Sequence, residues 1–261
     1  MINNLLRKVK KAPWVLAQPL TKKPNNPQSV ISDLVVWRCN QDWSTYFELL
    51  DLASLFGDEG QHQVDIVFFD NNGENFHQKS IELSGLYRQV LDISKVLSTL
   101  KYLPSDYGTF CVFHKKIPNS VLKLQSFIAE RGYVSYQYKN APLRSYVHGN
   151  LDAIDDSLAL LSGSSFLSRK YNLQYLLEMG KAYEITLVNA SSKNKKVEFK
   201  VIDFNDSIWM EKCITLKPKQ LFILSVKDFP NPSQLIIKSK IIMARPVVFC
   251  FDNDKMDVFH G

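Results

Sequence analysis

The chain contains few of the residues on which common functional motifs depend. Only 10 of its 261 residues are glycine, and the patterns G-x-G-x-x-G, G-x-x-x-x-G-K-[ST], G-x-S-x-G and H-E-x-x-H are all missing. The motif evidence for dinucleotide binding, a phosphate-binding loop, an α/β-hydrolase or a zinc peptidase is therefore lacking. No apolar run approaches the roughly 18 residues of a membrane-spanning helix. We expect no transmembrane segment and no cofactor.

Cysteine is also scarce, and its placement argues against disulfides and metal binding. The chain has 4 cysteines and no C-x-x-C pair, and each cysteine lies in or beside an apolar stretch. Buried free thiols are typical of a reducing compartment. Because the first residues also lack the pattern of a secretory signal, the sequence predicts a cytoplasmic protein. The cysteines are Cys39, Cys111, Cys213 and Cys250.

The net charge of +6 lies entirely in a basic N-terminal arm, residues 1–30, which has six basic residues and no acidic ones. The rest of the chain is balanced, so no basic surface for nucleic acid is predicted. Residues 1–28 have three possible roles: packing on the protein or a neighbouring subunit, a weak peripheral contact with an anionic membrane, or a solvated tail. We favour packing, because Trp14-Val15-Leu16 is apolar.

An internal repeat is the main organising feature. Val64–Asp70 resembles Val197–Asp203, 133 residues later, in its strand pattern and turn position. Upstream, an offset of 138 pairs Trp37 with Tyr175 and Leu49 with Leu187. What repeats is hydrophobic pattern and turn spacing, with few identities, so the sequence predicts a structural duplication.

The repeated segments have the composition of β-strands. Short runs of β-branched and aromatic residues are separated by turn residues at intervals of roughly 8–12 residues, which is typical of an antiparallel sandwich. We therefore predict a mainly all-β protein with two tandem antiparallel β-sandwich modules of immunoglobulin-like shape, at residues 31–150 and 170–261. The first module would carry a helical insertion near residues 119–131, and residues 151–169 would form a helical linker. Three tryptophans in strand patterns are expected in the core: Trp37, Trp43 and Trp209.

The most chemically varied segment is Tyr133 to Asn150. Aromatic rings with interleaved hydrogen-bonding groups suit a sugar or another polar ligand, because a ring covers an apolar sugar face while polar groups hold its hydroxyls. The alternative is that the tyrosines are ordinary strand residues. The candidate ligand-binding residues are Tyr136, Tyr138, Arg144, Tyr146, His148 and Asn150.

The sequence shows neither a recognisable set of catalytic residues nor a metal-binding pattern. His148-Gly149 and His260-Gly261 end the two copies alike, which favours a strand exit into a turn. Asp70 and Asp203 are placed as turn residues and lack the other ligands of a calcium loop.

These observations predict a non-catalytic binding or assembly protein that recognises a carbohydrate or other polar ligand, a protein partner or a second copy of itself. The alternative is an enzyme of small-molecule or sugar metabolism that uses His148, Arg144 and Tyr146.

Overall fold

The chain is mostly β-structure in several antiparallel sheets, as the strand pattern predicts. The computed structural model describes residues 30–55, 60–83, 88–115, 128–130, 132–149, 153–162, 164–241 and 246–261. The basic arm and Asn150 lie outside these residues. Among the described residues, no helix is both long and apolar enough to cross a membrane.

Eight strands between Val35 and His148 form two four-stranded sheets, in the orders β2-β7-β4-β5 and β10-β9-β3-β6. We call this pair of sheets the first sandwich. Two short helices, α2 (Leu52–Leu55) and α3 (Ile93–Ser98), follow β3 and β6. The strands are β2 (Val35–Arg38), β3 (Trp43–Leu50), β4 (Gln63–Asp70), β5 (Asn75–Glu82), β6 (Arg88–Asp92), β7 (Tyr107–His114), β9 (Tyr133–Tyr138) and β10 (Ser145–His148).

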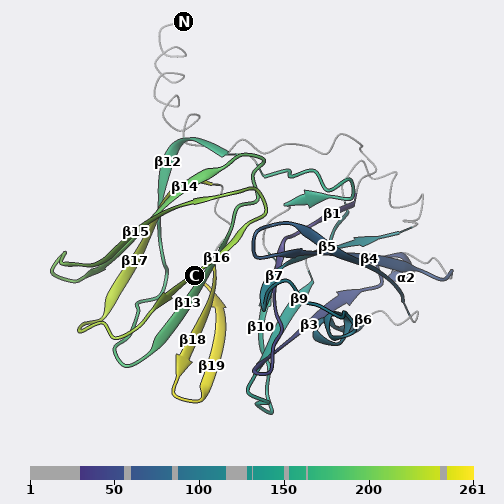
Figure 1. Cartoon of the computed structure of the whole chain (residues 1–261), viewed down its shortest axis with the longest axis horizontal. Helices are drawn as coiled ribbons and strands as arrows, with labels where there is room; N and C mark the ends of the chain where they lie inside the picture. Colours follow the sequence, from purple (N-terminus) through teal and green to yellow (C-terminus); the bar gives the residue numbers. More distant parts are fainter. Residues whose placement is uncertain are drawn as a thin grey trace, which may run out of the picture.

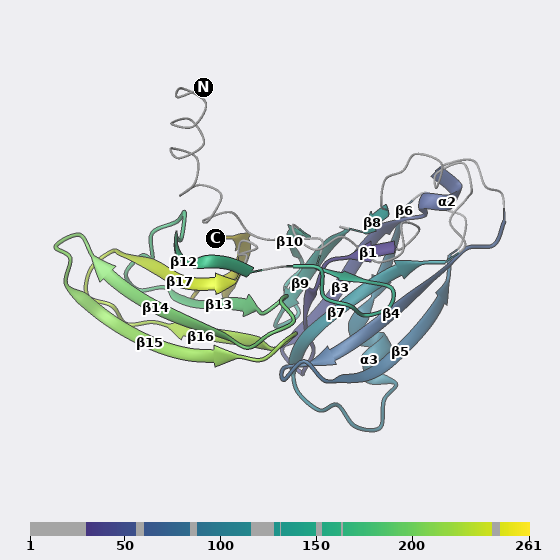
Figure 2. The same ribbon diagram turned by 90° about the horizontal axis from the view of Figure 1, so that it is seen from above.

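Eight later strands form the second sandwich, with sheets β12-β17-β14-β15 and β16-β13-β18-β19. Figure 1 shows it, in green and yellow, beside the first sandwich, and Figure 2 shows the same arrangement from above. The strands are β12 (Ser164–Asn172), β13 (Ala182–Val188), β14 (Lys195–Asp203), β15 (Ile208–Leu216), β16 (Leu221–Val226), β17 (Ser233–Ile241), β18 (Val247–Asp252) and β19 (Lys255–His260).

The two sandwiches have the same strand order. If the eight strands of each are counted along the chain, one sheet has the order first, sixth, third, fourth, and the other has the order fifth, second, seventh, eighth. The segments paired from the sequence, Val64–Asp70 and Val197–Asp203, lie in the third strand of each. The sequence pairing of Trp37 with Tyr175 is wrong. Trp37 lies opposite Gly108 in the first sandwich, and the residue at the corresponding place in the second sandwich is Leu177, opposite Ser233.

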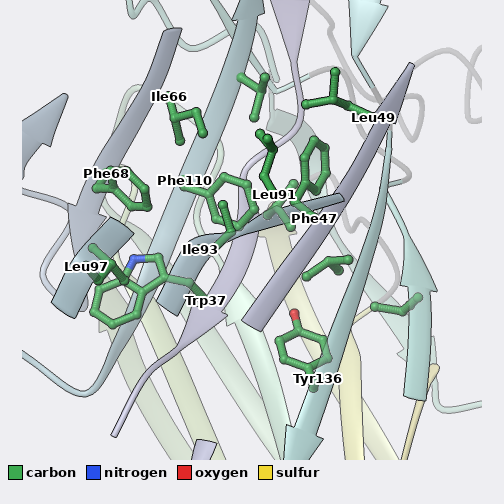
Figure 3. Packing of buried hydrophobic residues seen from close by; sticks show 14 of the residues in the cluster. Trp37, Phe47, Leu49, Ile66, Phe68, Leu91, Ile93, Leu97, Phe110 and Tyr136 are labelled. Atoms are coloured by element: carbon green, nitrogen blue, oxygen red, sulfur yellow. The ribbon is translucent and has the colours of Figure 1, made fainter. Parts of the chain in front are cut away.

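The core of the first sandwich lies between its two sheets. Ile66 and Phe68 of β4, Phe110 of β7 and Phe47 of β3 are at most 1% exposed, and Figure 3 shows them converging from both sheets. The rings of Phe47 and Phe110 meet edge to face, with centroids 5.3 Å apart. Edge-to-face contacts of this kind add to the stabilisation from burial.

The other face of β4 is buried as well, which explains its nearly continuous apolar sequence. Val67 and Phe69 pack in a separate cluster with Val30 and Ile154. These come from a small third sheet, β11-β1-β8, whose strands are β1 (Val30–Ser32), β8 (Ile128–Glu130) and β11 (Ile154–Asp155).

The third sheet corrects two helical predictions. Part of the helix expected near residues 119–131 is strand β8, which pairs in parallel with β1; residues 116–127 and 131 lie outside the described residues. The expected linker, residues 151–169, contributes β11 and the start of β12, and its described residues contain no helix. Strand pairing with β1 and β17 prevails there over local sequence preference.

Trp209 was also predicted wrongly. Trp37 and Trp43 are buried, at 0% and 5% exposed, but Trp209 is 40% exposed. It lies on β15, an edge strand of its sheet, and packs against Phe229 with ring centroids 6.3 Å apart. Successive side chains of a strand point to opposite faces of the sheet, and here the neighbouring Met210 packs against the core.

One face of sheet β16-β13-β18-β19 packs against the first sandwich. Phe249 of β18 is 0% exposed, and its ring centroid lies 5.3 Å from that of Trp43 and 4.9 Å from that of Tyr136. Arg38 forms an ion pair with Glu184 of β13, and its guanidinium lies 3.8 Å from the Trp43 ring centroid. Aromatic packing and an ion pair therefore hold the two sandwiches together.

A second contact joins two turns. Leu221 donates its backbone N–H to the carbonyl oxygen of Asn71 at 3.1 Å. Gly73 has a φ of +84°, and a Cβ there would lie 2.7 Å from the Pro218 carbonyl oxygen. Glycine is therefore required at this turn both by its left-handed backbone and by the close approach of the second sandwich.

Candidate functional site

The side chains of the Tyr133–His148 segment alternate between two faces of sheet β10-β9-β3-β6. Because successive side chains of a strand point to opposite faces, Tyr136 and Tyr133 are separated. Tyr136 is 0% exposed, whereas Tyr133 is 56% exposed. The segment therefore supplies residues both to the core and to the outer surface.

The inward residues are used in packing. Tyr136 donates its hydroxyl to the Val36 carbonyl oxygen at 2.8 Å, and burial raises the pKa of this hydroxyl above its usual range. Tyr138 is half-buried, with its ring centroid 4.8 Å from that of Trp43 and 5.4 Å from that of Phe251. These two predicted ligand residues therefore belong to the core and the contact between the sandwiches.

The outward residues form an exposed aromatic surface. The Arg144 guanidinium lies 3.6 Å from the Tyr46 ring centroid, and Tyr146 is 48% exposed. The register places Tyr146 opposite Ser135 and His148 opposite Tyr133, so these residues share one face. We call this surface the tyrosine face, defined by Tyr46, Tyr133, Arg144, Tyr146 and His148.

A partly shielded charge pair lies on the same face. Glu48 is opposite Tyr133 on one side and Val90 on the other. Its side chain is 8% exposed and forms an ion pair with Arg88, whose side chain is 66% exposed. Since Leu50 and Val90 are 45% and 49% exposed, the tyrosine face continues into an apolar margin.

The two strand-end histidines meet where β10 and β19 lie side by side. The ring centroids of His148 and His260 are 4.8 Å apart, and His260 Nε2 lies 2.6 Å from the His148 carbonyl oxygen. Both histidines line a cavity of about 60 Å³ between the sandwiches. This cavity is smaller than the roughly 300 Å³ at which small-molecule sites begin, so it does not accommodate a sugar.

One group of residues resembles a catalytic triad in composition but not in geometry. The Asp51 carboxylate and the Ser54 hydroxyl lie 2.9 and 3.3 Å from the same ring nitrogen, Nδ1 of His62. A triad places the nucleophile on the other ring nitrogen. Asp51 also accepts a hydrogen bond from the Ser54 backbone N–H at 3.2 Å, so the group stabilises the start of α2.

Asp51 has a perturbed pKa. Its burial acts to raise the pKa of the carboxyl, but hydrogen bonds from His62 and Ser54 outweigh burial and hold the pKa below its usual value. Within the described part of the chain, no cluster of three or more His, Cys, Asp or Glu side chains could hold a metal ion.

Sequence reasoning missed the contribution of β3 to the tyrosine face. Tyr46 and Glu48 lie more than eighty residues before the Tyr133–His148 segment and join it only through the β3–β9 pairing. Tyr46 and Glu48 are two residues apart in β3, which indicates that they share one face of the sheet. The sequence of β3 does not identify the strand that pairs with it. Asn150, the remaining predicted ligand residue, lies outside the described residues.

Comparison with known proteins identifies no relative. No protein-family model matches the chain, and no curated protein matches it. Among solved structures, it is similar to a beta-glucuronidase from glycoside hydrolase family 2, with 10% identity and a TM-score of 0.17, over 92% of this chain and 22% of the enzyme chain. It is also similar to the structure of infectious bursal disease virus Gt strain, with 11% identity and a TM-score of 0.17, over 89% of this chain and 55% of that one.

Proposed function

We propose that this is a non-catalytic binding or assembly protein that recognises its partner through the tyrosine face. The observation that carries the proposal is the cluster of three tyrosines with Arg144 on one sheet face, where Tyr133 and Tyr146 are exposed. Tyrosine and arginine are enriched among the residues that dominate protein interfaces, because each buries a large area and keeps hydrogen-bonding groups.

The architecture is part of the proposal. We interpret the shared strand order as a duplication of one sandwich module. As in an immunoglobulin domain, the second strand pairs with the fifth and the third with the sixth. The first strand, however, pairs with the sixth and the seventh with the second, where an immunoglobulin domain pairs the first with the second and the sixth with the seventh. The four free cysteines are compatible with a cytoplasmic location.

A carbohydrate is the second candidate partner. The stacking of Arg144 on Tyr46 beside Tyr146 offers a ring for an apolar sugar face and a guanidinium for hydroxyls. We favour a protein partner because the tyrosine face extends over three neighbouring strands, β3, β9 and β10, whereas the neighbouring cavity is about 60 Å³. The enzyme alternative is weaker, because His148 Nδ1 lies 2.7 Å from the Gly149 carbonyl oxygen and, among the described residues, no serine or cysteine is hydrogen-bonded to its ring.

The test combines two binding measurements on the same variants. The first is calorimetric titration with glucose, galactose, N-acetylglucosamine, glucuronate and their oligosaccharides. The second is sedimentation velocity of the full chain over a concentration series. The double substitution Arg144→Ala and Tyr146→Ala should weaken whichever binding the parent shows, whereas Tyr102→Ala, at a 77% exposed tyrosine elsewhere, should not.

Equal behaviour of the parent and the double variant in both measurements would contradict the proposal. Turnover of p-nitrophenyl glycosides that is lost in His148→Ala would instead favour the enzyme alternative.

A further inference from the structure

We propose that the partner of the tyrosine face is a second copy of this chain, which it contacts at the β12–β13 loop of the second sandwich. The contact would repeat, between copies, the packing of the second sandwich on the first. This inference rests on the proposed function and names the partner. We call the loop surface the acceptor loop, defined by Tyr175, Leu176, Glu178 and Met179.

The internal contact supplies the template. The outer face of sheet β16-β13-β18-β19 presents Glu184 and Phe249. The first sandwich receives them at Arg38 and Trp43, which lie at the two ends of the β2–β3 connection. A sandwich of this type therefore has one contact surface on the outer face of one sheet and another at the loop between its first two strands.

The register shows that the tyrosine face is the counterpart of the outer face in the template. Phe47 pairs with Val134, as Ile185, 138 residues later, pairs with Val248. Tyr46 therefore stands where Glu184 stands. By the same register Ser135 corresponds to Phe249, and the β10 residue Tyr146 corresponds to Val258 of β19.

The acceptor loop is likewise the counterpart of the β2–β3 connection. Leu177 lies opposite Ser233 as Trp37 lies opposite Gly108, so Glu178 occupies the position of Arg38. In contrast to the buried β2–β3 contact, the flanking side chains are open: Tyr175, Leu176 and Met179 are 51%, 43% and 56% exposed. Exposed surfaces thus recur at the positions of both halves of the template contact, with Lys181 at the position of Trp43.

The tyrosine face and the acceptor loop carry opposite charges, as the two sides of the internal contact do. The signs are exchanged between the loop and the sheet face. In the internal contact, the loop supplies Arg38 and the sheet face supplies Glu184. At the free surfaces, the loop supplies Glu178, whose side chain is 62% exposed. The sheet face supplies Arg144, whose guanidinium lies over Tyr46, the residue at the position of Glu184. A like-charged pair here would oppose docking.

The Glu178 side chain forms a surface ion pair with Lys181 at 2.8 Å. Such exposed pairs contribute little, so exchanging Lys181 for Arg144 of another copy costs little. Arginine is the better partner, because its planar guanidinium can bind a carboxylate through two hydrogen bonds. The contact is heterologous, with different surfaces on the two copies, so it generates a ring or an open chain of subunits.

Charge reversal in the full-length chain tests the inference by sedimentation velocity. The parent should associate with rising concentration. Arg144→Glu or Glu178→Arg alone should lower the association constant at least tenfold. A mixture of the two single variants should restore association, as should both substitutions in one chain, because opposite charges then face each other at each contact. Lys101→Glu and Glu211→Arg make the same charge changes on exposed side chains elsewhere and should behave as the parent.

The tyrosines provide an independent check that does not depend on charge. Tyr133→Asp on the tyrosine face and Tyr175→Asp in the acceptor loop should each reduce association, with thermal unfolding confirming that both variants are folded.

A parent that is monomeric up to about 1 mM, which corresponds to only some 4 kcal/mol of binding free energy, would overturn the inference. So would single variants that associate like the parent, or a mixture that fails to recover. If the parent is monomeric but binds a saccharide and Arg144→Ala abolishes that binding, only the choice of partner is wrong. If neither association nor saccharide binding responds to the tyrosine-face variants, the proposed function fails as well.

Discussion

The two sandwiches solve the same packing problem with different residues. In the first sandwich, Trp37 of β2 lies opposite Gly108 of β7. In the second, Leu177, which follows β12 in the β12–β13 loop, forms an isolated bridge with Ser233 of β17. Both Trp37 and Leu177 are 0% exposed. A larger side chain is matched with a smaller neighbour, as close packing requires. The two sandwiches therefore have the same strand order, although the sizes of the two facing residues differ between them.

The outer faces of the corresponding sheets differ more, because among the described residues only one of them packs against the other sandwich. Where the second sandwich has Phe249, fully buried against the first, the first has the small residue Ser135 beside the exposed Tyr133 and Tyr146. The covered face presents Phe249 and Glu184, whereas the other face presents three tyrosines and Arg144. This composition suits a surface that must remain soluble alone and still bind.

The largest effect is expected where the covered face is anchored. Phe249→Ala should lower the free energy of unfolding by about 4 kcal/mol, because a fully buried phenylalanine is removed and a cavity is left. Urea unfolding followed by tryptophan fluorescence measures the loss, and Phe204→Ala, at a 72% exposed phenylalanine of the same sandwich, should cost less than about 0.5 kcal/mol. Equal costs for the two variants would show that the internal contact stabilises nothing.

The facing pair of the first and sixth strands gives the next largest effect. In Gly108→Ser, the new Cβ would lie 2.1 Å from the Phe69 carbonyl oxygen and 2.9 Å from Trp37 Nε1. That oxygen also accepts a hydrogen bond from the Trp37 indole. We expect a loss of about 3 kcal/mol in urea unfolding. The reciprocal change, Ser233→Gly, should cost only about 1 kcal/mol; a larger cost for Ser233→Gly would mean that the two positions are not packed as described.

Reversing the internal ion pair should show a smaller, coupled effect. Arg38→Glu and Glu184→Arg should each cost about 2 kcal/mol, since each leaves two like charges facing each other in a partly buried contact. The double variant should be at least 1 kcal/mol more stable than the sum of the single losses predicts. A double-mutant cycle by urea unfolding measures this coupling, and strict additivity would contradict a direct contact.

The smallest effect is expected at the residue that directly follows the second strand, which is Asp51 in the first sandwich and Asn189 in the second. Asp51 is charged and has a lowered pKa. Its counterpart Asn189 is neutral and donates to the Leu216 carbonyl oxygen at 3.0 Å. Asp51→Ala should cost about 1 kcal/mol at pH 7 through loss of the helix cap.

The pH dependence of that cost has a definite sign. A lowered pKa means that ionised Asp51 stabilises the fold above its unfolded pKa of about 3.9, and that this stabilisation is lost as the pH falls through the folded value. The cost of Asp51→Ala should therefore shrink below about pH 4, whereas the cost of Asn189→Ala should not depend on the titration of its own side chain. Urea unfolding at pH 7, 4 and 3 measures both; a pH-independent cost of Asp51→Ala would be evidence against the lowered pKa.

The strands and their repeat were predictable because they depend on local pattern. The repeated segments Val64–Asp70 and Val197–Asp203 fall within β4 and β14. The third sheet was not predictable, because β1 and β11 have only 3 and 2 residues and exist through long-range pairing. Short apolar segments of this kind do not distinguish a strand from a helix on their own.

The candidate site was predictable only in part. Arg144, Tyr146 and His148 share the outer face, but Tyr136 and Tyr138 point inward, because strand alternation divides neighbouring tyrosines between two faces. The sequence alone cannot say which face is the core when both carry aromatic residues. Likewise, the β12–β13 loop is two residues longer than the expected alignment allows, and this insertion is visible only once the bridge between Leu177 and Ser233 is known.

The central claim is that the tyrosine face and the acceptor loop form one contact between copies, and tyrosine oxidation by hydroxyl radicals tests it on the unaltered chain. Labelling of Tyr133, Tyr146 and Tyr175 would be followed by mass spectrometry as the protein concentration rises, with the exposed Tyr102 as the internal reference. We expect labelling at the three tyrosines to fall together while Tyr102 stays constant. Labelling that is unchanged at all four residues, or that falls on only one of the two surfaces, would contradict the claim.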